Sequence, residues 1–165
     1  MEGSVKELSR YRFEMSVENL EDAQIMYENK RYKNTLNRAY YSIFHAIRAV
    51  TALDGFDSSK HSGVIAFFNQ QYVKTEVFPR ELSKIIREAS VKREKADYLD
   101  FFVASKHEAE NQIERARVFI GYVREYLIGK GVRLPEGDLD KWKPLKDALD
   151  MFSSDYMEEG RAEQD

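Results

Sequence analysis

Residues 1–78 contain no proline, and their apolar side chains recur every three or four positions, which is the period of an α-helix. A first helix is predicted over residues 4–29, with one apolar face formed by Phe13, Val17, Leu20, Ala23 and Tyr27. The polar residues 29–31 predict a tight turn, and a second helix is predicted over residues 32–53, ending before Gly55. The first half of the chain therefore favours two long helices joined by a tight turn.

Three further helices are predicted after this pair. The third has its N-cap candidates at residues 57–59 and runs to about Tyr72, and the fourth covers residues 79–95 and begins with a proline, which suits a first helical turn. Ser105 and Glu108 form a capping box ahead of a fifth helix. Its apolar residues alternate in steps of four and three: Ala109, Ile113, Ala116, Ile120, Val123 and Leu127. The pattern predicts an all-α, up-and-down bundle of about five helices over residues 1–128, dimeric through the second helix or this fifth-helix seam.

The composition excludes several classes of protein. There is no cysteine, so a disulfide, a thiolate zinc site and a cysteine nucleophile are all excluded. The formal net charge is −3, and the strongly basic surface of a general nucleic-acid binder is missing. No stretch approaches 18 apolar residues, and the N-terminus has no apolar signal region, which predicts a cytoplasmic protein.

Residues 129–165 are predicted to form an acidic C-terminal extension outside the bundle. They carry ten acidic and six basic side chains and are interrupted by Pro135 and Pro144. One amphipathic piece, residues 143–152, favours a short helix. We expect Trp142 to be partly buried against the bundle or a second subunit, so that the extension is partly docked.

The second predicted helix carries a polar side that has the residue types of a reaction site. Arg38 and His45 are seven positions apart, which places them within about 20° of each other on one helical face. Tyr41, Ser42 and Arg48 fall on the same side. This side is either a site or the polar side of a long core helix, on which the arginine and histidine only find hydrogen-bond partners.

Three segments of the chain follow one another in a recognisable order. They read Asn-Arg-Ala-Tyr-Tyr-Ser-Ile-Phe-His-Ala at residues 37–46, Lys-His-Ser-Gly-Val-Ile at residues 60–65, and Arg-Glu-Lys-Ala-Asp-Tyr at residues 93–98. With the helices around them, they resemble the HEPN superfamily over about residues 10–128, in particular its small stand-alone bacterial and archaeal branch. The resemblance implies a four-to-five-helix bundle that forms a homodimer with a cleft between the subunits. It also implies a minimal nucleotidyltransferase as partner in a toxin–antitoxin pair.

Several branches of this superfamily are metal-independent endoribonucleases with an Arg-x(4–6)-His motif. Arg38 and His45, with six residues between them, fit that spacing. In the best-known branches the motif lies on a later helix, and no such run occurs between residues 80 and 128. On this interpretation His45 is the general acid or base, Arg38 holds the phosphate, and Tyr41 orients the base or donates to the phosphate.

Arg48, Lys60 and His61 are candidates for nucleotide or phosphate binding. Lys60 and His61 open the third predicted helix, where the helix dipole favours anions. His61 is alternatively an ordinary helix-start histidine bonded to a loop carbonyl.

Arg93, Asp97 and Tyr98 are interpreted as structural. Arg93 and Asp97 are four positions apart on one helix, which favours an ion pair, and we interpret that pair as a clasp beneath Tyr98. No His-x3-His or carboxylate–histidine pair is in register for a metal, and no glycine-rich phosphate loop occurs, so no metal or cofactor is predicted.

Three functions follow from these observations. The first is a binding module that docks a nucleotidyltransferase partner, and a nucleotide, in a toxin–antitoxin type system. The second is a metal-independent endoribonuclease toxin that uses Arg38 and His45. The third is a non-catalytic oligomeric scaffold.

Overall fold

The structure, a computed structural model, describes residues 2–135 and confirms the all-α fold. Within these residues, five α-helices and one short π-helix follow one another: α1 (Glu2–Glu28), α2 (Tyr32–Leu53), α3 (His61–Phe68), η1 (Asn69–Val73), α4 (Glu81–Tyr98) and α5 (Lys106–Gly129). The described residues contain no strand. None of the helices in this part of the chain is long and apolar enough to span a bilayer.

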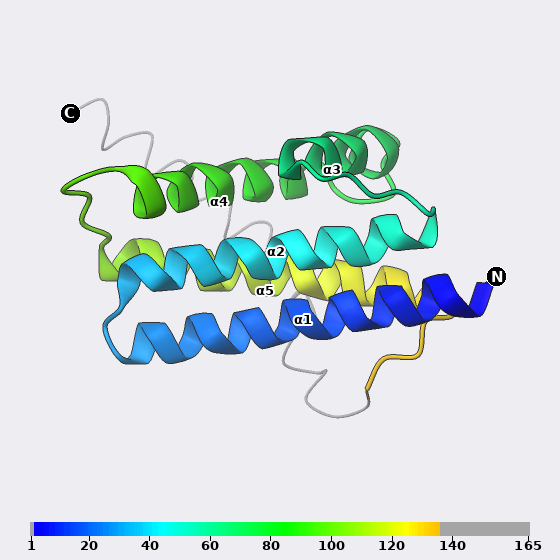
Figure 1. Cartoon of the computed structure of the whole chain (residues 1–165), viewed down its shortest axis with the longest axis horizontal. Helices are drawn as coiled ribbons and strands as arrows, with labels where there is room; N and C mark the ends of the chain where they lie inside the picture. Colours follow the sequence, from blue (N-terminus) through cyan, green and yellow to red (C-terminus); the bar gives the residue numbers. More distant parts are fainter. Residues whose placement is uncertain (1, 136–165) are drawn as a thin grey trace.

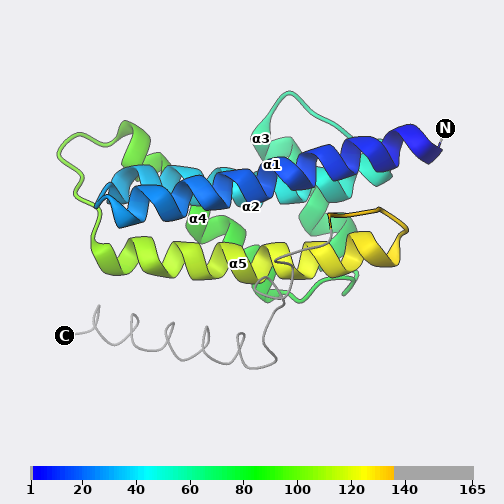
Figure 2. The ribbon, with the colours of Figure 1, turned by 90° about the horizontal axis from the view of Figure 1, so that it is seen from below.

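Helix α2 lies at the centre of the bundle and packs against α1, α3, α4 and α5. α1 and α2 form an antiparallel pair, and α5 runs alongside both (Figures 1 and 2). α4 lies along another side of α2, and α3 continues this layer over the C-terminal half of α2 (Figure 1). The central helix therefore buries most of its surface and leaves only a narrow side for polar residues.

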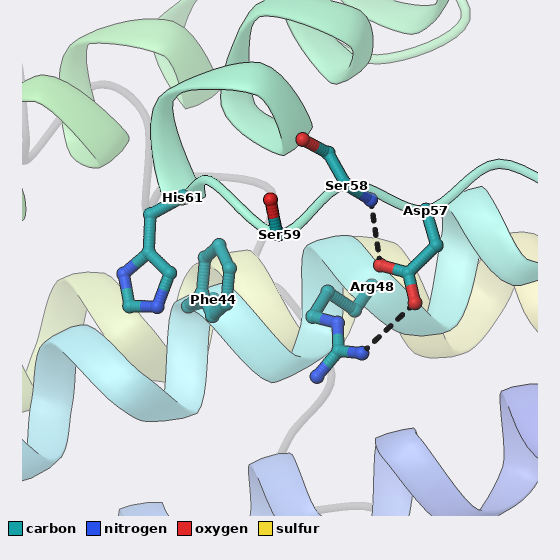
Figure 3. A pocket seen from close by; sticks show the side chains of 6 residues that line it. All are labelled: Phe44, Arg48, Asp57, Ser58, Ser59 and His61. Atoms are coloured by element: carbon teal, nitrogen blue, oxygen red, sulfur yellow. Dashed lines mark hydrogen bonds and ion pairs between the residues drawn. The ribbon is translucent and has the colours of Figure 1, made fainter.

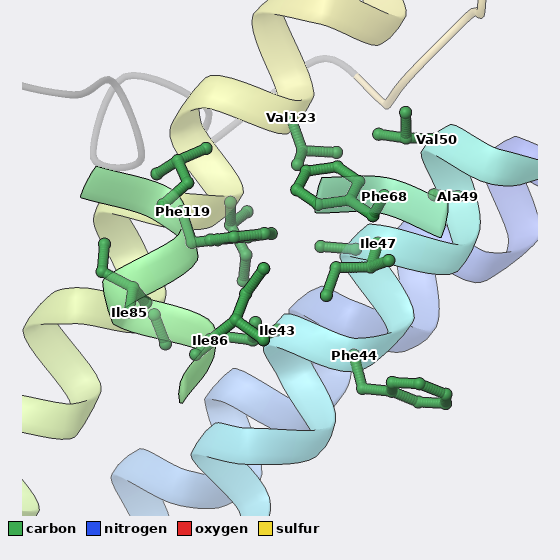
Figure 4. Close-up of a cluster of buried hydrophobic side chains, with 14 of the residues drawn as sticks. Ile43, Phe44, Ile47, Ala49, Val50, Phe68, Ile85, Ile86, Phe119 and Val123 are labelled. Carbon is green, nitrogen blue, oxygen red and sulfur yellow. The ribbon is translucent and has the colours of Figure 1, made fainter. Parts of the chain in front are cut away.

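The main core gathers where α2 meets α3, α4 and α5. Figure 4 shows the buried side chains that meet there, among them Ile43, Ile47, Phe68, Ile85, Ile86, Phe119 and Val123. The fifth-helix seam is buried in this core from Ala109 to Leu127. The predicted four-three spacing of the seam is confirmed. The seam packs inside the bundle, however, so its side chains are not exposed for contact with a second copy of the chain.

Two buried serines of α1 fix its position against α2. Ser9 Oγ donates to the carbonyl oxygen of Ala49 at 2.7 Å, and Ser16 Oγ donates to that of Ser42 at 2.5 Å. Ser42 was expected on the polar side of α2, but it is fully buried, and its hydroxyl donates to the carbonyl oxygen of Ala39 at 2.9 Å. A small hydroxyl on a helix is readily satisfied by the preceding turn, so Ser42 belongs to the α1–α2 contact.

The predicted third helix is two elements in the structure. It begins at His61, and at Asn69 it widens into η1, where Lys74 N–H donates to the Asn69 carbonyl at 2.9 Å. The wider turn brings Val73 round to the buried side already occupied by Phe68 and Tyr72. Sequence periodicity assumes a constant turn, so it did not anticipate this change.

The bounds of α4 and the cap of α5 lie close to the positions that the sequence predicts. α4 begins two residues after Pro79 and continues three residues past its predicted end, to Tyr98. The capping box ahead of α5 is confirmed: Glu108 N–H donates to Ser105 Oγ at 3.0 Å, and Ser105 N–H donates to Glu108 Oε2 at 2.9 Å. After α5, Val132 is still buried in the core. The docked helix and the burial predicted for Trp142 lie outside the described residues.

Candidate functional site

Four predicted site residues follow one another along the narrow polar side of α2. Arg38, Tyr41, His45 and Arg48 are spaced three, four and three residues apart, and each is half-buried. The Arg38 guanidinium lies over the Tyr41 ring at 5.4 Å, and the Tyr41 and His45 ring centroids are 6.4 Å apart. The helix therefore presents a cation, a phenol, an imidazole and a second cation in sequence.

Neutral side chains hold Arg38 in place. Its Nε and Nη2 donate to Asn37 Oδ1 at 2.9 and 2.5 Å, and its Nη1 donates to Asn19 Oδ1 of α1 at 3.3 Å. Among residues 2–135, no carboxylate forms an ion pair with Arg38. The guanidinium is thus fixed in position while its charge stays available to an anion.

His61, at the start of α3, lies over aromatic side chains of α2. Its ring centroid is 4.1 Å from that of Phe44, and its Nδ1 is 3.2 Å from Tyr40 Oη. Tyr41 contacts it edge-on, with centroids 5.9 Å apart, so Tyr41 touches both His45 and His61. The structure thus brings the two predicted imidazoles to one place, and the Tyr40 hydroxyl, not a loop carbonyl, is the hydrogen-bond partner of His61 Nδ1.

An open pocket of about 560 Å³ lies beside His61. Figure 3 shows Phe44 and His61 on one side of it and the Arg48–Asp57 pair on the other, with Ser58 and Ser59 of the α2–α3 loop between them. The Arg48–Asp57 ion pair is 3.4 Å long. Lys60, the third candidate for phosphate binding, is exposed at the N-cap of α3 and does not line the pocket.

Burial and the charges around the site lower the pKa of both histidines and so favour their neutral forms. Burial lowers the pKa of His45, and Arg48, Arg12 and Arg38 lower it further in that order. Burial also lowers the pKa of His61, together with Arg93 and Arg48. A neutral imidazole can take up a proton, so the polar side of α2 combines a proton acceptor with cations that attract an anion.

The Asp57 carboxylate is anchored from three directions. Ser58 N–H donates to its Oδ1 at 2.8 Å, and Arg12 and Arg48 bind its Oδ2 at 3.2 and 3.4 Å. The Ser58 bond is the largest cause of its lowered pKa; burial opposes the shift, and Arg48 and Arg12 add to it. Asp57 thus stays ionised and binds both Arg48, which lines the pocket, and Arg12 of α1.

The Arg93–Asp97 pair forms, but it does not lie beneath Tyr98. Arg93 Nη1 is 3.8 Å from Asp97 Oδ2, and the Arg93 guanidinium lies over the Tyr40 ring at 4.6 Å and over Tyr41 at 5.9 Å. Tyr98 is 76% exposed. The Arg93 guanidinium therefore lies against the α2 rings of the site, while Asp97 stays at the C-terminal end of α4.

The sequence-based interpretation missed the contribution of α1. Arg12 donates to the Arg48 carbonyl at 3.2 Å and binds Asp57, and Asn19 binds Arg38. Both belong to a stripe of buried polar residues spaced three, four and three apart: Ser9, Arg12, Ser16 and Asn19. A regular polar stripe beside the apolar face of α1 was the signal that would have identified these partners.

In the described part of the chain, no group of three or more His, Asp or Glu side chains is placed so that it could hold a metal ion. The third histidine, His107, is exposed on α5, and its Nε2 is 3.1 Å from Asn111 Nδ2. The arrangement on α2 is suited to binding a phosphate and to moving a proton without a metal.

Comparison with known proteins gives one family. Residues 9–126 match the model of the HEPN domain. A protein of Methanocaldococcus jannaschii named "Putative toxin MJ0142" is 31% identical over 128 residues, which are 78% of this chain and 87% of that protein. "Putative toxin MJ0605" of the same organism is 32% identical over 74% of this chain and 91% of its own length. A UPF0332 protein of Thermotoga maritima is 31% identical over 66% of this chain and 82% of its own length.

Proposed function

Since the chain belongs to the HEPN domain family, we propose that it is a toxin-type, metal-independent endoribonuclease whose active site is the polar side of α2. The observation that carries the proposal is the position of His45, a proton acceptor in contact with Tyr41 and placed among Arg38 and Arg48. Two of the related proteins carry the word toxin in their names. The side chains of the site, two arginines, a tyrosine and a histidine, are of the types that hold a phosphate and move a proton.

The proposed reaction is cleavage of RNA by its own 2′-hydroxyl. His45 takes the proton of the 2′-hydroxyl as the 2′-oxygen forms a bond to the adjacent phosphorus. The bond from phosphorus to the 5′-oxygen breaks, and solvent entering through the pocket protonates that oxygen. The products are a 2′,3′-cyclic phosphate and a 5′-hydroxyl. Arg38 and Arg48 compensate the charge that develops on the phosphorane oxygens.

Cleavage of a labelled RNA in the presence of EDTA tests this proposal. We expect His45→Gln to lower the rate by about 10²–10⁴-fold, the usual contribution of a general base, and Arg38→Ala to lower it by about 10²-fold or more. His107→Gln is the matched control, because His107 is exposed on α5, and it should cleave as the wild type does. Equal cleavage by all four proteins, or activity that EDTA abolishes, would contradict the assignment.

A second function, docking of a minimal nucleotidyltransferase in a toxin–antitoxin pair, is favoured by the connection between α4 and α5. Four apolar side chains there are exposed: Tyr98, Leu99, Phe101 and Val103. An apolar cluster of this kind on the surface is typical of a protein–protein contact. Phe101 is fully exposed and has a positive φ of 63°, a backbone conformation that costs free energy and is maintained here at the tip of the connection.

Co-expression with a minimal nucleotidyltransferase tests the second function. Phe101→Ser should abolish a complex seen with the wild type, and Ile25→Ser, which changes an exposed apolar residue of α1, should leave it intact. Loss of the complex in both variants, or in neither, would show that the α4–α5 connection is not the docking surface.

A further inference from the structure

Asn37, next to Arg38 on α2, connects the site to the end of α4. Its Oδ1 accepts two hydrogen bonds from Arg38, and its Nδ2 is 3.0 Å from each carboxylate oxygen of Asp97. A guanidinium only donates and a carboxylate only accepts, so the two partners fix which way the amide faces. The Asn37 side chain is thus held between one group that must donate to it and one that must accept from it.

The two charged ends of this hydrogen-bonded chain differ in how their charges are balanced. Asp97 pairs with Arg93 at 3.8 Å, so its negative charge is balanced on the α4 side. Within residues 2–135, Arg38 donates its side-chain hydrogen bonds only to amide oxygens, those of Asn37 and Asn19. A direct Arg38–Asp97 ion pair would fix the guanidinium equally well, but it would also cancel its charge.

We propose that Asn37 is a positioning residue, which transmits the position of Asp97 to the Arg38 guanidinium while leaving the Arg38 charge free for a phosphate. The inference rests on the proposed function for the identity of the anion, and on the hydrogen bonds alone for the positioning. Asn37 touches no substrate in this account and acts only through Arg38.

Binding of a single-stranded RNA with 2′-O-methyl groups, which cannot be cleaved, separates charge from position. Asn37→Asp keeps the shape of the side chain and places a carboxylate on Arg38. The affinity of this variant for the RNA should fall about tenfold, as expected when a charged hydrogen bond is lost. The slope of log K against log salt should become shallower by about 0.7, the value for one phosphate contact on a single strand. Asn37→Ala leaves the charge in place and should keep the slope. Asn111→Asp, the same change on α5, is the matched control and should bind as the wild type does.

The exchanged pair Asn37→Asp with Asp97→Asn tests the role directly. It restores an amide and a carboxylate in hydrogen-bond contact, so a merely structural role of the pair would be rescued. The proposal expects no rescue of binding, because Arg38 still faces a carboxylate. Wild-type affinity and salt slope in this double variant would overturn the inference.

A second readout needs no RNA. In the wild type the Nε–H of Arg38 is bonded to Asn37 Oδ1 at 2.9 Å, and its NMR signal should exchange slowly with solvent. Asn37→Ala should speed that exchange at least tenfold, whereas Asn111→Ala should not change it. Unchanged exchange in Asn37→Ala would overturn the positioning role. Failure of the wild type to bind RNA, with exchange as expected, would instead contradict the proposed function and leave the positioning role intact.

Discussion

Substitution of Gly63 by alanine tests the packing of the pocket loop against α3. Gly63 lies in the first turn of α3, and a Cβ at this position would be 2.7 Å from Ser58 Oγ and 3.3 Å from Ser58 Cβ. Ser58 Oγ in turn accepts a hydrogen bond from Lys60 N–H at 3.2 Å. The hydroxyl must therefore rotate away to admit a methyl group, and the Lys60 N–H loses its partner.

Two effects of similar size oppose each other in this variant. Alanine is favoured over glycine within a helix by up to about 1 kcal/mol, and the lost hydrogen bond costs about 1 kcal/mol. Gly63→Ala alone should thus change the free energy of unfolding little. In a Ser58→Ala background, which has already lost the hydrogen bond, the same change should stabilise the protein by about 0.5–1 kcal/mol.

The assay is a double-mutant cycle of thermal or urea unfolding on the wild type, both single variants and the double variant. The expected coupling of about 1 kcal/mol corresponds to about 3 °C in melting temperature for a chain of this size. Gly129→Ala is the control, since nothing lies within 4 Å of a Cβ there, and its effect should not depend on Ser58. An equal effect of Gly63→Ala in both backgrounds would refute the contact between Gly63 and Ser58.

Four further outcomes are expected. Burial lowers the folded-state pKa of His45 below 6.5, so the unfolded chain binds more protons than the folded chain in mild acid. The free energy of unfolding should therefore fall as the pH drops through and below about 6.5. His45→Gln should flatten this pH dependence in unfolding measured between about pH 7 and 5. Asp57→Asn removes a carboxylate from Arg12 and Arg48, so binding of uncleavable RNA should tighten and its salt dependence should steepen, and unchanged binding would speak against the pocket. Phe119→Ala should cost about 3–5 kcal/mol in urea unfolding, whereas Phe101→Ala should change stability by less than about 0.5 kcal/mol. Light scattering should give a dimer of the 19.4 kDa chain, and a monomer would remove the cleft expected between subunits.

Patterns within one helix were readable from the sequence. The range of α2, the apolar seam of α5 and its capping box depend on spacing over a few turns, and the structure confirms them. The spacing did not show which other helix, or which other copy of the chain, each helical face packs against. Periodicity identified the seam of α5 but did not indicate whether it meets the same chain or another copy.

The site shows the same division between local and distant information. Arg38, Tyr41 and His45 share one side of α2, as helical spacing predicts, and the same spacing places Tyr40 and Phe44 on the apolar, core-facing side. Their rings also support His61, which is 21 residues from Tyr40 in sequence. Such contacts depend on the path of the α2–α3 loop, and no pattern within the helix encodes that path.

The hydrogen bonds between α1 and α2 decide which parts of the site can move. Contacts at Ser9, Arg12, Ser16 and Asn19 follow one another along the middle of the interface, so sliding α1 by one turn, about 5.4 Å, would break them together. The α1–α2 pair, which carries Arg38 and His45, is therefore expected to stay fixed when a ligand binds. We expect a ligand that needs more room to displace residues 54–60, three of which line the pocket, and amide exchange in that loop should report its arrival.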